Sequence, residues 1–259
     1  MAQFHTDQQE YHNNWNLFDV VMLADKDGNI LSTSGSASNI PIAAGSVGGY
    51  AHINKFGYSD VFKSTPVTVW DDASIYAYPS IATVAAVSGN ATDTGALINI
   101  QGLDENGVPV AEDVLVGASS TTLFKRVFRA KLMEHPSLEV NDDDITVTVD
   151  AKSAAIIKAG KGQTLMALYT IPAGKTGYLL KFQGTVDKAN NAIFYIITKV
   201  NGGVVNTKGQ FGTFGVPVTY DYPVPLVFEE GTDVEVRVVG DSTMSGGAIF
   251  DLILVDNPA

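Results

Sequence analysis

QTLMALYTIPAGKTGYLLKF, residues 163–182, is the stretch that carries the strongest fold signal in this chain. It predicts two β-strands joined by a turn at 171–175, because Pro172 presets φ for a turn and Gly174 can take the positive φ that closes it. Both expected strands are apolar on both faces. Such strands lie between two layers, or between a sheet and a partner subunit. We therefore expect the C-terminal half of the chain to be built around this hairpin.

The composition favours an all-β globular protein. The 259 residues are 45% hydrophobic and 17% charged, which is typical of a chain with a buried core. The 25 glycines and 10 prolines fit many short strands and tight turns, and helix signals are scarce. The length suits one large β-domain or two ordinary ones.

The formal net charge of -12 is confined to the first part of the chain. Residues 1–150 hold 7 Lys and Arg against 19 Asp and Glu, whereas residues 151–259 hold 9 of each kind. An acidic surface argues against direct nucleic-acid binding, which needs basic charge to release counterions. The alternative interpretation is that the acidity serves only solubility.

The chain has no cysteine, so we expect no disulfide framework and no thiolate site. This absence favours assembly in a reducing cytoplasm. The first residues, MAQFHTDQQEYHNNW, lack the basic-then-apolar pattern of a signal peptide. No run of about 18 apolar residues occurs, so we expect no transmembrane helix and no membrane partner.

Turn signals and polarity suggest three parts. Residues 1–16 are polar and predict an extended arm that becomes ordered only against a neighbour, with a frayed terminus as the alternative. Residues 17–150 predict a β-rich domain that contains a long irregular loop at 39–80. Residues 151–259 predict a jelly-roll-like β-sandwich of about eight strands, in which the long apolar last strand is central. The fold class is therefore all-β with two β-sandwich domains.

Local patterns predict particular strands and turns. Lys26-Asp27-Gly28-Asn29 and Glu105-Asn106-Gly107 are hairpin turn signals between apolar runs. The segment 121–133 fits a strand or a helix, and we favour the strand. The segment 233–239 alternates, with Val234, Val236 and Val238 on one face and Glu235 and Arg237 on the other.

Aromatic side chains gather in the arm and in the long loop. Aromatic residues held in extended chain pack on a neighbouring domain or on another subunit. We predict six of them as partner-binding residues: Trp15, Phe56, Tyr58, Trp70, Tyr76 and Tyr78.

No pattern of catalytic, cofactor-binding or metal-ligating residues is visible. The four histidines do not pair at a metal-ligand spacing, and adjacent acidic residues on a strand face opposite sides, so neither a zinc site nor a glycosidase pair is expected. The one basic cluster is Lys125, Arg126, Arg129 and Lys131. It predicts an anion or partner contact or, more commonly, a solvated strand edge. We therefore expect no enzymatic activity, no cofactor and no metal.

Three groups of segments occur together in a particular order. The first is HINKFGY at 52–58 followed by VWD at 69–71; the second is VSGNATDTG at 87–95, IQGLD at 100–104 and EDV at 112–114; the third is GQTL at 162–165, YTIPAGKT at 169–176, PLV at 225–227 and FDL at 250–252. The series resembles a family of structural proteins of tailed bacteriophages, common among marine podovirus-like phages. The resemblance covers roughly residues 50–256 and leaves residues 1–49 outside.

The resemblance implies a non-enzymatic virion component, assembled in the host cytoplasm, with no catalytic residues to carry over. The expected function is to decorate or cement the capsid through repeated subunit contacts, or to attach to the tail, as a homo-oligomer. The expected partners are other virion proteins, either the major capsid protein or tail components. A different class is a carbohydrate-binding adhesin that presents Trp70, Tyr76 and Tyr78 to a host glycan. A hydrolase is the least favoured class.

Overall fold

The computed structural model describes residues 23–24, 30–31, 42–45, 47–187, 191–200 and 202–258. The chain divides into two compact units, Met1–Gly48 and Gly49–Ala259. In the first unit, β1 (Leu23–Ala24) pairs antiparallel with β2 (Ile30–Leu31), which confirms the predicted strand pairing there. The predicted arm with Trp15 lies outside the described residues. No helix in the described part of the chain is long and apolar enough to cross a membrane.

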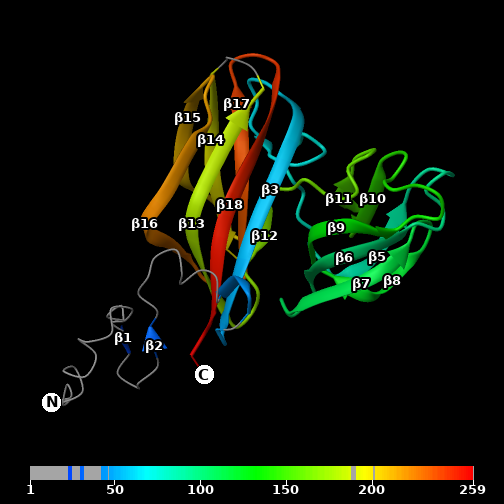
Figure 1. The fold of residues 1–259 in the computed structure, drawn as a ribbon, viewed down its shortest axis with the longest axis horizontal. Helices are drawn as coiled ribbons and strands as arrows, with labels where there is room; N and C mark the ends of the chain where they lie inside the picture. Colours follow the sequence, from blue (N-terminus) through cyan, green and yellow to red (C-terminus); the bar gives the residue numbers. More distant parts are fainter. Residues whose placement is uncertain are drawn as a thin grey trace, which may run out of the picture. The chain divides into compact units, whose positions relative to one another are not determined.

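The second unit is built on an eight-stranded jelly roll (Figure 1). Its first sheet has the order β16-β13-β18-β3, and its second sheet has the order β12-β17-β14-β15. Successive strands change sheet at every step except between β14 and β15, which is the jelly-roll pattern of two interlocked Greek keys. The strands are β3 (Tyr50–Phe62), β12 (Leu168–Thr170), β13 (Lys175–Val186), β14 (Asn191–Val200), β15 (Val205–Phe214), β16 (Val218–Phe228), β17 (Thr232–Gly240) and β18 (Met244–Asp256). The predicted all-β, jelly-roll-like sandwich is confirmed.

Alternating side chains from the two sheets fill the space between them. The last strand, β18, lies between β13 and β3, so its predicted central position is confirmed. Every second residue of β18 from Ala248 to Leu254 is buried in the core. The second sheet contributes inward residues from β14 and β17, namely Phe194, Ile196, Val234, Val236 and Val238. The sandwich core therefore follows the period-two pattern of the sequence.

The predicted hairpin at 163–182 is wrong in one respect. A turn does close there, and Gly174 takes φ 71° as expected. However, β12 pairs with β17 in the second sheet, whereas β13 pairs with β16 and β18 in the first. The turn therefore carries the chain from one sheet to the other. All three residues of β12 are buried, in agreement with a strand that lies between layers.

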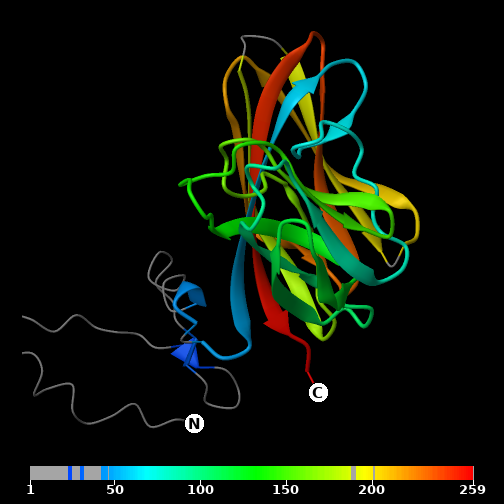
Figure 2. The ribbon, with the colours of Figure 1, turned by 90° about the vertical axis from the view of Figure 1, so that its right-hand side faces the viewer.

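A second, smaller sandwich is inserted between β3 and β12 of the jelly roll, and it faces the viewer in Figure 2. Its strands form two sheets of order β11-β10-β5-β8 and β7-β6-β9. The strands are β5 (Thr83–Ser88), β6 (Leu97–Leu103), β7 (Pro109–Leu115), β8 (Ser119–Phe124), β9 (Arg126–Glu134), β10 (Ile145–Val149) and β11 (Lys152–Ile157). The hairpin predicted at Asn106-Gly107 joins β6 to β7, and Gly107 has φ 77°. The strand interpretation of 121–133 is also confirmed, because this segment supplies β8 and β9.

Sheet pairing differs from the predicted division of the chain in two places. The predicted irregular loop at 39–80 is wrong for Tyr50–Phe62, which forms the 13-residue strand β3 and pairs with β18. At the other end, Lys152–Ile157 pairs with β10 of the inserted sandwich. The hydrogen-bonded sheets therefore do not divide at residue 150. Instead, the jelly roll takes strands from both sides of the insertion.

Candidate functional site

Strand pairing, hydrogen bonds and an ion pair meet at the joint, the region where the chain leaves the jelly roll and returns to it. The outgoing strand β4 (Val67–Thr68) pairs with Arg237 and Val238 of β17. The returning strand β12 pairs with the preceding part of the same strand, Asp233–Glu235. Both crossings therefore lie end to end along one edge of β17, and backbone pairing fixes them to the same strand.

Three backbone hydrogen bonds close the space between the two crossings. The amide of Ala167 donates to the carbonyl of Val69 at 2.9 Å, the amide of Val69 donates to Val236 at 2.8 Å, and the amide of Val236 donates to Ala167 at 3.0 Å. Gly57 of β3 lies directly against this triangle. A Cβ at that position would be 2.2 Å from the carbonyl oxygen of Val69 and 2.3 Å from the amide nitrogen of Ala167. Glycine is therefore required there for the backbones to approach this closely.

Three aromatic rings, those of Trp70, Tyr76 and Tyr78, pack beside these crossings, and we call them the aromatic cluster. The rings of Trp70 and Tyr76 meet edge to face at 5.0 Å, and those of Tyr76 and Tyr78 at 4.8 Å. The hydroxyl of Tyr76 donates to the carbonyl of Ala154 at 2.8 Å, inside the inserted sandwich. Trp70 and Tyr76 are 2% and 3% exposed, so neither ring offers a face to a separate molecule. These aromatic residues were expected to pack on a neighbouring domain or on another subunit. Trp70 and Tyr76 pack on the inserted sandwich of the same chain.

A buried ion pair joins the inserted sandwich to the jelly roll. Arg126, at the start of β9, binds both carboxylate oxygens of Asp233 on β17, with Nε–Oδ1 at 2.8 Å and a terminal nitrogen to Oδ2 at 3.0 Å. The side chains are 13% and 1% exposed. Asp233 also accepts the Thr170 hydroxyl at 2.6 Å. This bidentate geometry is the strongest form of the arginine–carboxylate contact.

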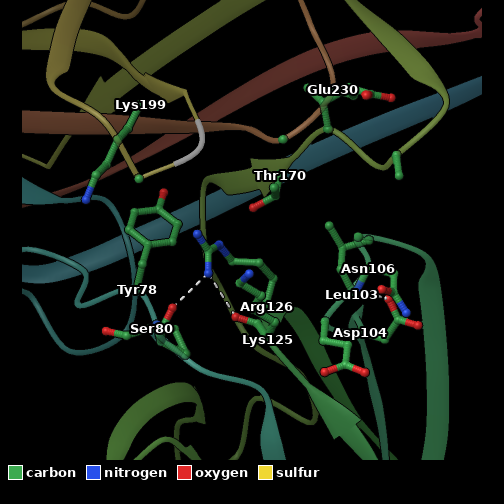
Figure 3. A pocket seen from close by; sticks show the side chains of 17 residues that line it. Tyr78, Ser80, Leu103, Asp104, Asn106, Lys125, Arg126, Thr170, Lys199 and Glu230 are labelled. Atoms are coloured by element: carbon green, nitrogen blue, oxygen red, sulfur yellow. Dashed lines mark hydrogen bonds between the residues drawn. The ribbon is translucent and has the colours of Figure 1, made fainter.

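The other terminal nitrogen of Arg126 is hydrogen-bonded as well. It donates to the carbonyls of Pro79 at 2.8 Å and Lys125 at 3.0 Å (Figure 3). The guanidinium carbon lies 5.1 Å from the centre of the Tyr78 ring, which is a cation–π distance. The interpretation of this part of the basic cluster as a solvated strand edge is therefore wrong for Arg126.

A pocket of about 570 Å³ opens beside this ion pair. Its walls come from turns of both sandwiches, and Figure 3 shows Lys199 and Tyr78 across from Asp104 and Asn106. Two wall carboxylates are already used to shape turns: Asp104 accepts the amides of Asn106 and Val108, and Glu230 accepts that of Gly174. Charges of both signs line the pocket, so its walls do not select a ligand of one charge.

Lys55 of β3 is buried at the joint. Its ammonium nitrogen donates to the carbonyl of Phe128, which occupies an irregularity in the pairing of β9 with β6. Its charge lies over the Phe128 ring at 5.8 Å. Burial, followed by repulsion from Arg129, lowers the pKa of Lys55 to about 7. Asp71 is perturbed in the opposite direction, because burial raises the pKa of this carboxyl to about 7.

We expect the stability of the protein to rise with pH above about 7 because of Lys55. The unfolded chain keeps this amine protonated up to about pH 10.5, whereas the folded chain releases the proton near pH 7. In this window unfolding takes up a proton, so raising the pH stabilises the folded state. Urea unfolding at pH 7, 8 and 9 measures the slope. In Lys55→Met the rise should be absent, and an equal rise in both proteins would contradict this assignment.

Two of the predicted aromatic residues, Phe56 and Tyr58, lie on the outer face of β3 and are half-buried. Together with Ile249 of β18 and Gln183 and Thr185 of β13, they line a groove of about 540 Å³. Arg129 of the inserted sandwich approaches the Phe56 ring at 6.0 Å. These two aromatics, unlike Trp70 and Tyr76, therefore border open space.

The sequence interpretation missed the residues that hold the joint together. Arg126 and Asp233 are 107 positions apart, and no spacing rule links them. The only signal was the position of Asp233 and Glu235 on an otherwise valine-rich strand, where buried carboxylates demand partners. Among the described residues, no group of three or more histidines and carboxylates gathers as a metal site.

Comparison with known proteins identifies no family. No family model matches the chain, and no curated protein matches it. Among solved structures, the chain has 10% identity and a TM-score of 0.22 to a chain of infectious bursal disease virus Gt strain, over 80% of this chain and 72% of that one. A chain of the Gx strain gives 10% identity and a TM-score of 0.20, with 81% and 77% covered. A lipoprotein of Bacteroides thetaiotaomicron gives 12% identity and a TM-score of 0.17, over 82% of this chain and 97% of that one. Scores of this size do not establish a common fold.

Proposed function

We propose that this protein is a non-enzymatic structural component of a tailed-bacteriophage virion that decorates or cements the capsid in repeated copies. The observation that carries the proposal is the joint: a jelly roll with an inserted sandwich, locked by two adjacent strand crossings and a buried ion pair. The resemblance of residues 50–256 to phage structural proteins supports the part of the proposal that assigns the protein to a virion.

A locked joint suits a mechanical role. A protein that bridges neighbouring subunits must transmit force between its contact surfaces. A hinged connection between its two sandwiches would bend under that force instead of transmitting it. Here the inserted sandwich is attached to β17 by backbone pairing and to Asp233 by the guanidinium of Arg126. In the proposed function the partners are other virion proteins, and the protein acts in the particle after assembly in the host cytoplasm.

Immunogold labelling of purified particles with antibody to this chain tests the proposal. Label spread over the head is the expected result, and particles that lack the protein should then lose their DNA at a lower temperature. Label restricted to one vertex or to the tail would replace decoration with an adaptor or fibre role. Particles without label, in a preparation where the purified protein binds the antibody, would contradict the virion assignment.

A second candidate function is glycan binding at the groove beside Phe56 and Tyr58. The observation that favours it is two aromatic rings bordering a groove of about 540 Å³ that also contains the polar side chains of Gln183 and Thr185. Aromatic faces next to amide and hydroxyl groups are a common arrangement for sugar rings. A glycan array tests it, with Tyr58→Ala expected to abolish any signal. Binding that persists in Tyr58→Ala would exclude this groove.

A further inference from the structure

One edge of the jelly roll is unusually apolar and exposed. β15 and β16 are the end strands of the two sheets, and the turn 215–217 connects them. Along this edge, side chains that would normally be buried are open to solvent. They are Val204 (77% exposed), Val205 (48%), Phe214 (76%), Val216 (63%), Tyr220 (44%), Val224 (79%) and Val227 (62%). We call the segment Val204–Val227 the edge strip.

The two strands of the edge strip, β15 and β16, differ in how they are protected against pairing with a further strand. Natural sheets block their edges with proline, charge or bulges. β16 contains Pro223 and Pro225 beside an irregularity in its pairing with β13, so its ladder cannot be extended there. β15 has ten residues, no proline and only one charge, Lys208. Among the described strands it pairs with β14 alone, so its outer backbone groups are open to another strand.

The charge of the edge strip indicates which partner fits. The net charge of -12 is carried by residues 1–150, so two copies repel one another there and not along the neutral residues 151–259, which include the edge strip. The edge strip contains one cation, Lys208, and one anion, Asp221, and is therefore neutral. The edge strip is both neutral and apolar, so a second copy can approach it without repulsion between like charges.

The size of the edge strip is also sufficient. A standard interface takes about 20–30 residues from each partner. The edge strip, from Val204 to Val227, comprises 24 residues. Large exposed apolar patches on a soluble chain mark interaction sites.

We propose that the edge strip binds the edge strip of a second copy of this chain, with β15 pairing antiparallel to β15 of the partner. Antiparallel pairing of a strand with its own copy satisfies two-fold symmetry, since the same surface is used on both sides. The backbone of β15 supplies the hydrogen bonds. The exposed valines of β16, Val224 and Val227, supply apolar contact. This inference rests on the proposed function for the need for repeated copies.

Sedimentation equilibrium of the full chain, in the absence of particles, tests the interface. The wild-type protein should form a dimer, and Phe214→Lys and Val224→Lys should each weaken dimerisation at least tenfold. Both side chains are more than three-quarters exposed, so neither substitution disturbs the core. The matched control is Ile81→Lys, at a 60% exposed residue that belongs to the inserted sandwich segment, which should change the affinity less than twofold.

Single cysteines provide a second measurement, because the chain has none of its own. A two-fold contact brings the middle of β15 next to its own copy, so one of Lys208→Cys, Gln210→Cys and Gly212→Cys should form a disulfide-linked dimer on mild oxidation. Ile81→Cys should not. A wild-type monomer at all concentrations, or a dimer that Phe214→Lys leaves intact, would overturn the interface. Unlabelled particles would overturn the proposed function alone and leave a measured dimer standing.

Discussion

Replacing Arg126 by methionine should lower the free energy of unfolding by about 3–5 kcal/mol, because it leaves a buried carboxylate without its partner. The side chain of Asp233 is 1% exposed, and Arg126 supplies two of its hydrogen bonds. The Thr170 hydroxyl would remain as a donor, but it carries no charge. Methionine keeps the unbranched apolar stem of the side chain as far as the position of Nε and removes the cation. Urea denaturation at pH 7 measures the loss.

Two controls separate the buried charge from simple loss of packing. The double variant Arg126→Met with Asp233→Asn should recover part of the stability, since the remaining amide oxygen still accepts from Thr170 and no buried charge is left unpaired. Lys181→Ala removes an exposed ion pair with Asp221, whose nitrogen–oxygen distance is 3.7 Å, and should cost less than about 1 kcal/mol. A loss below about 1 kcal/mol for Arg126→Met would mean that solvent reaches Asp233.

The same network explains why the inserted sandwich does not need a long linker. The chain runs from β3 through a short segment into β4, which is already bonded to β17. The aromatic cluster follows within ten residues, and Arg126 of β9 adds the ion pair with Asp233 beside it. Backbone pairing, ring packing and one ion pair therefore act on the same small region, and the loss of any one should weaken the others.

Local signals in the sequence predicted local structure well. Asn106-Gly107 marks a hairpin because its glycine takes positive φ, and the structure places a two-strand connection there. The last strand was predicted to be central from its apolar length alone. These features depend on neighbouring residues, so the sequence contains the required information.

Features that depend on distant segments were not predictable in the same way. The turn at Pro172-Ala173-Gly174 has the residues of a hairpin, but whether its two strands share a sheet depends on β17 and β18, more than 50 residues further on. Similarly, β3 was missed because Lys55, Gly57 and Ser59 occupy its inward face, where a strand normally shows apolar side chains. Each of these three residues makes a contact within the joint, and this interrupts the alternation of apolar and polar side chains that marks a strand.

The partner-binding prediction illustrates the same limit. Trp70 and Tyr76 were singled out because aromatics in extended chain need a surface to pack on, and the inserted sandwich provides that surface within the same chain. Phe56 and Tyr58 border a groove instead. Sequence shows that an aromatic residue needs a partner surface, but it does not show whether that surface belongs to the same molecule.

Gly57→Ala should destabilise the protein by about 3 kcal/mol or more, at the upper end of the cost of overpacking. The new methyl group would lie 2.2 Å from the carbonyl oxygen of Val69 and 2.3 Å from the amide nitrogen of Ala167, far inside contact distance. Both atoms belong to the backbone, and they are hydrogen-bonded to each other. Neither can rotate away as a side chain would, so the two crossings must separate.

The direction of the stability change in Gly57→Ala distinguishes crowding in the folded state from the entropy of the unfolded state. Gly57 does not have a positive φ, so alanine at an uncrowded strand position would stabilise the chain by about 0.4–1 kcal/mol through the entropy of the unfolded state. Gly48→Ala is the matched control, since Gly48 has no positive φ and a Cβ there would meet nothing within 4 Å. Urea denaturation followed by tryptophan fluorescence suits the comparison, because Trp70 lies in the joint itself. Equal stability of the two alanine variants would show that the crossings can move apart, and a joint of that kind could not transmit force between the two sandwiches.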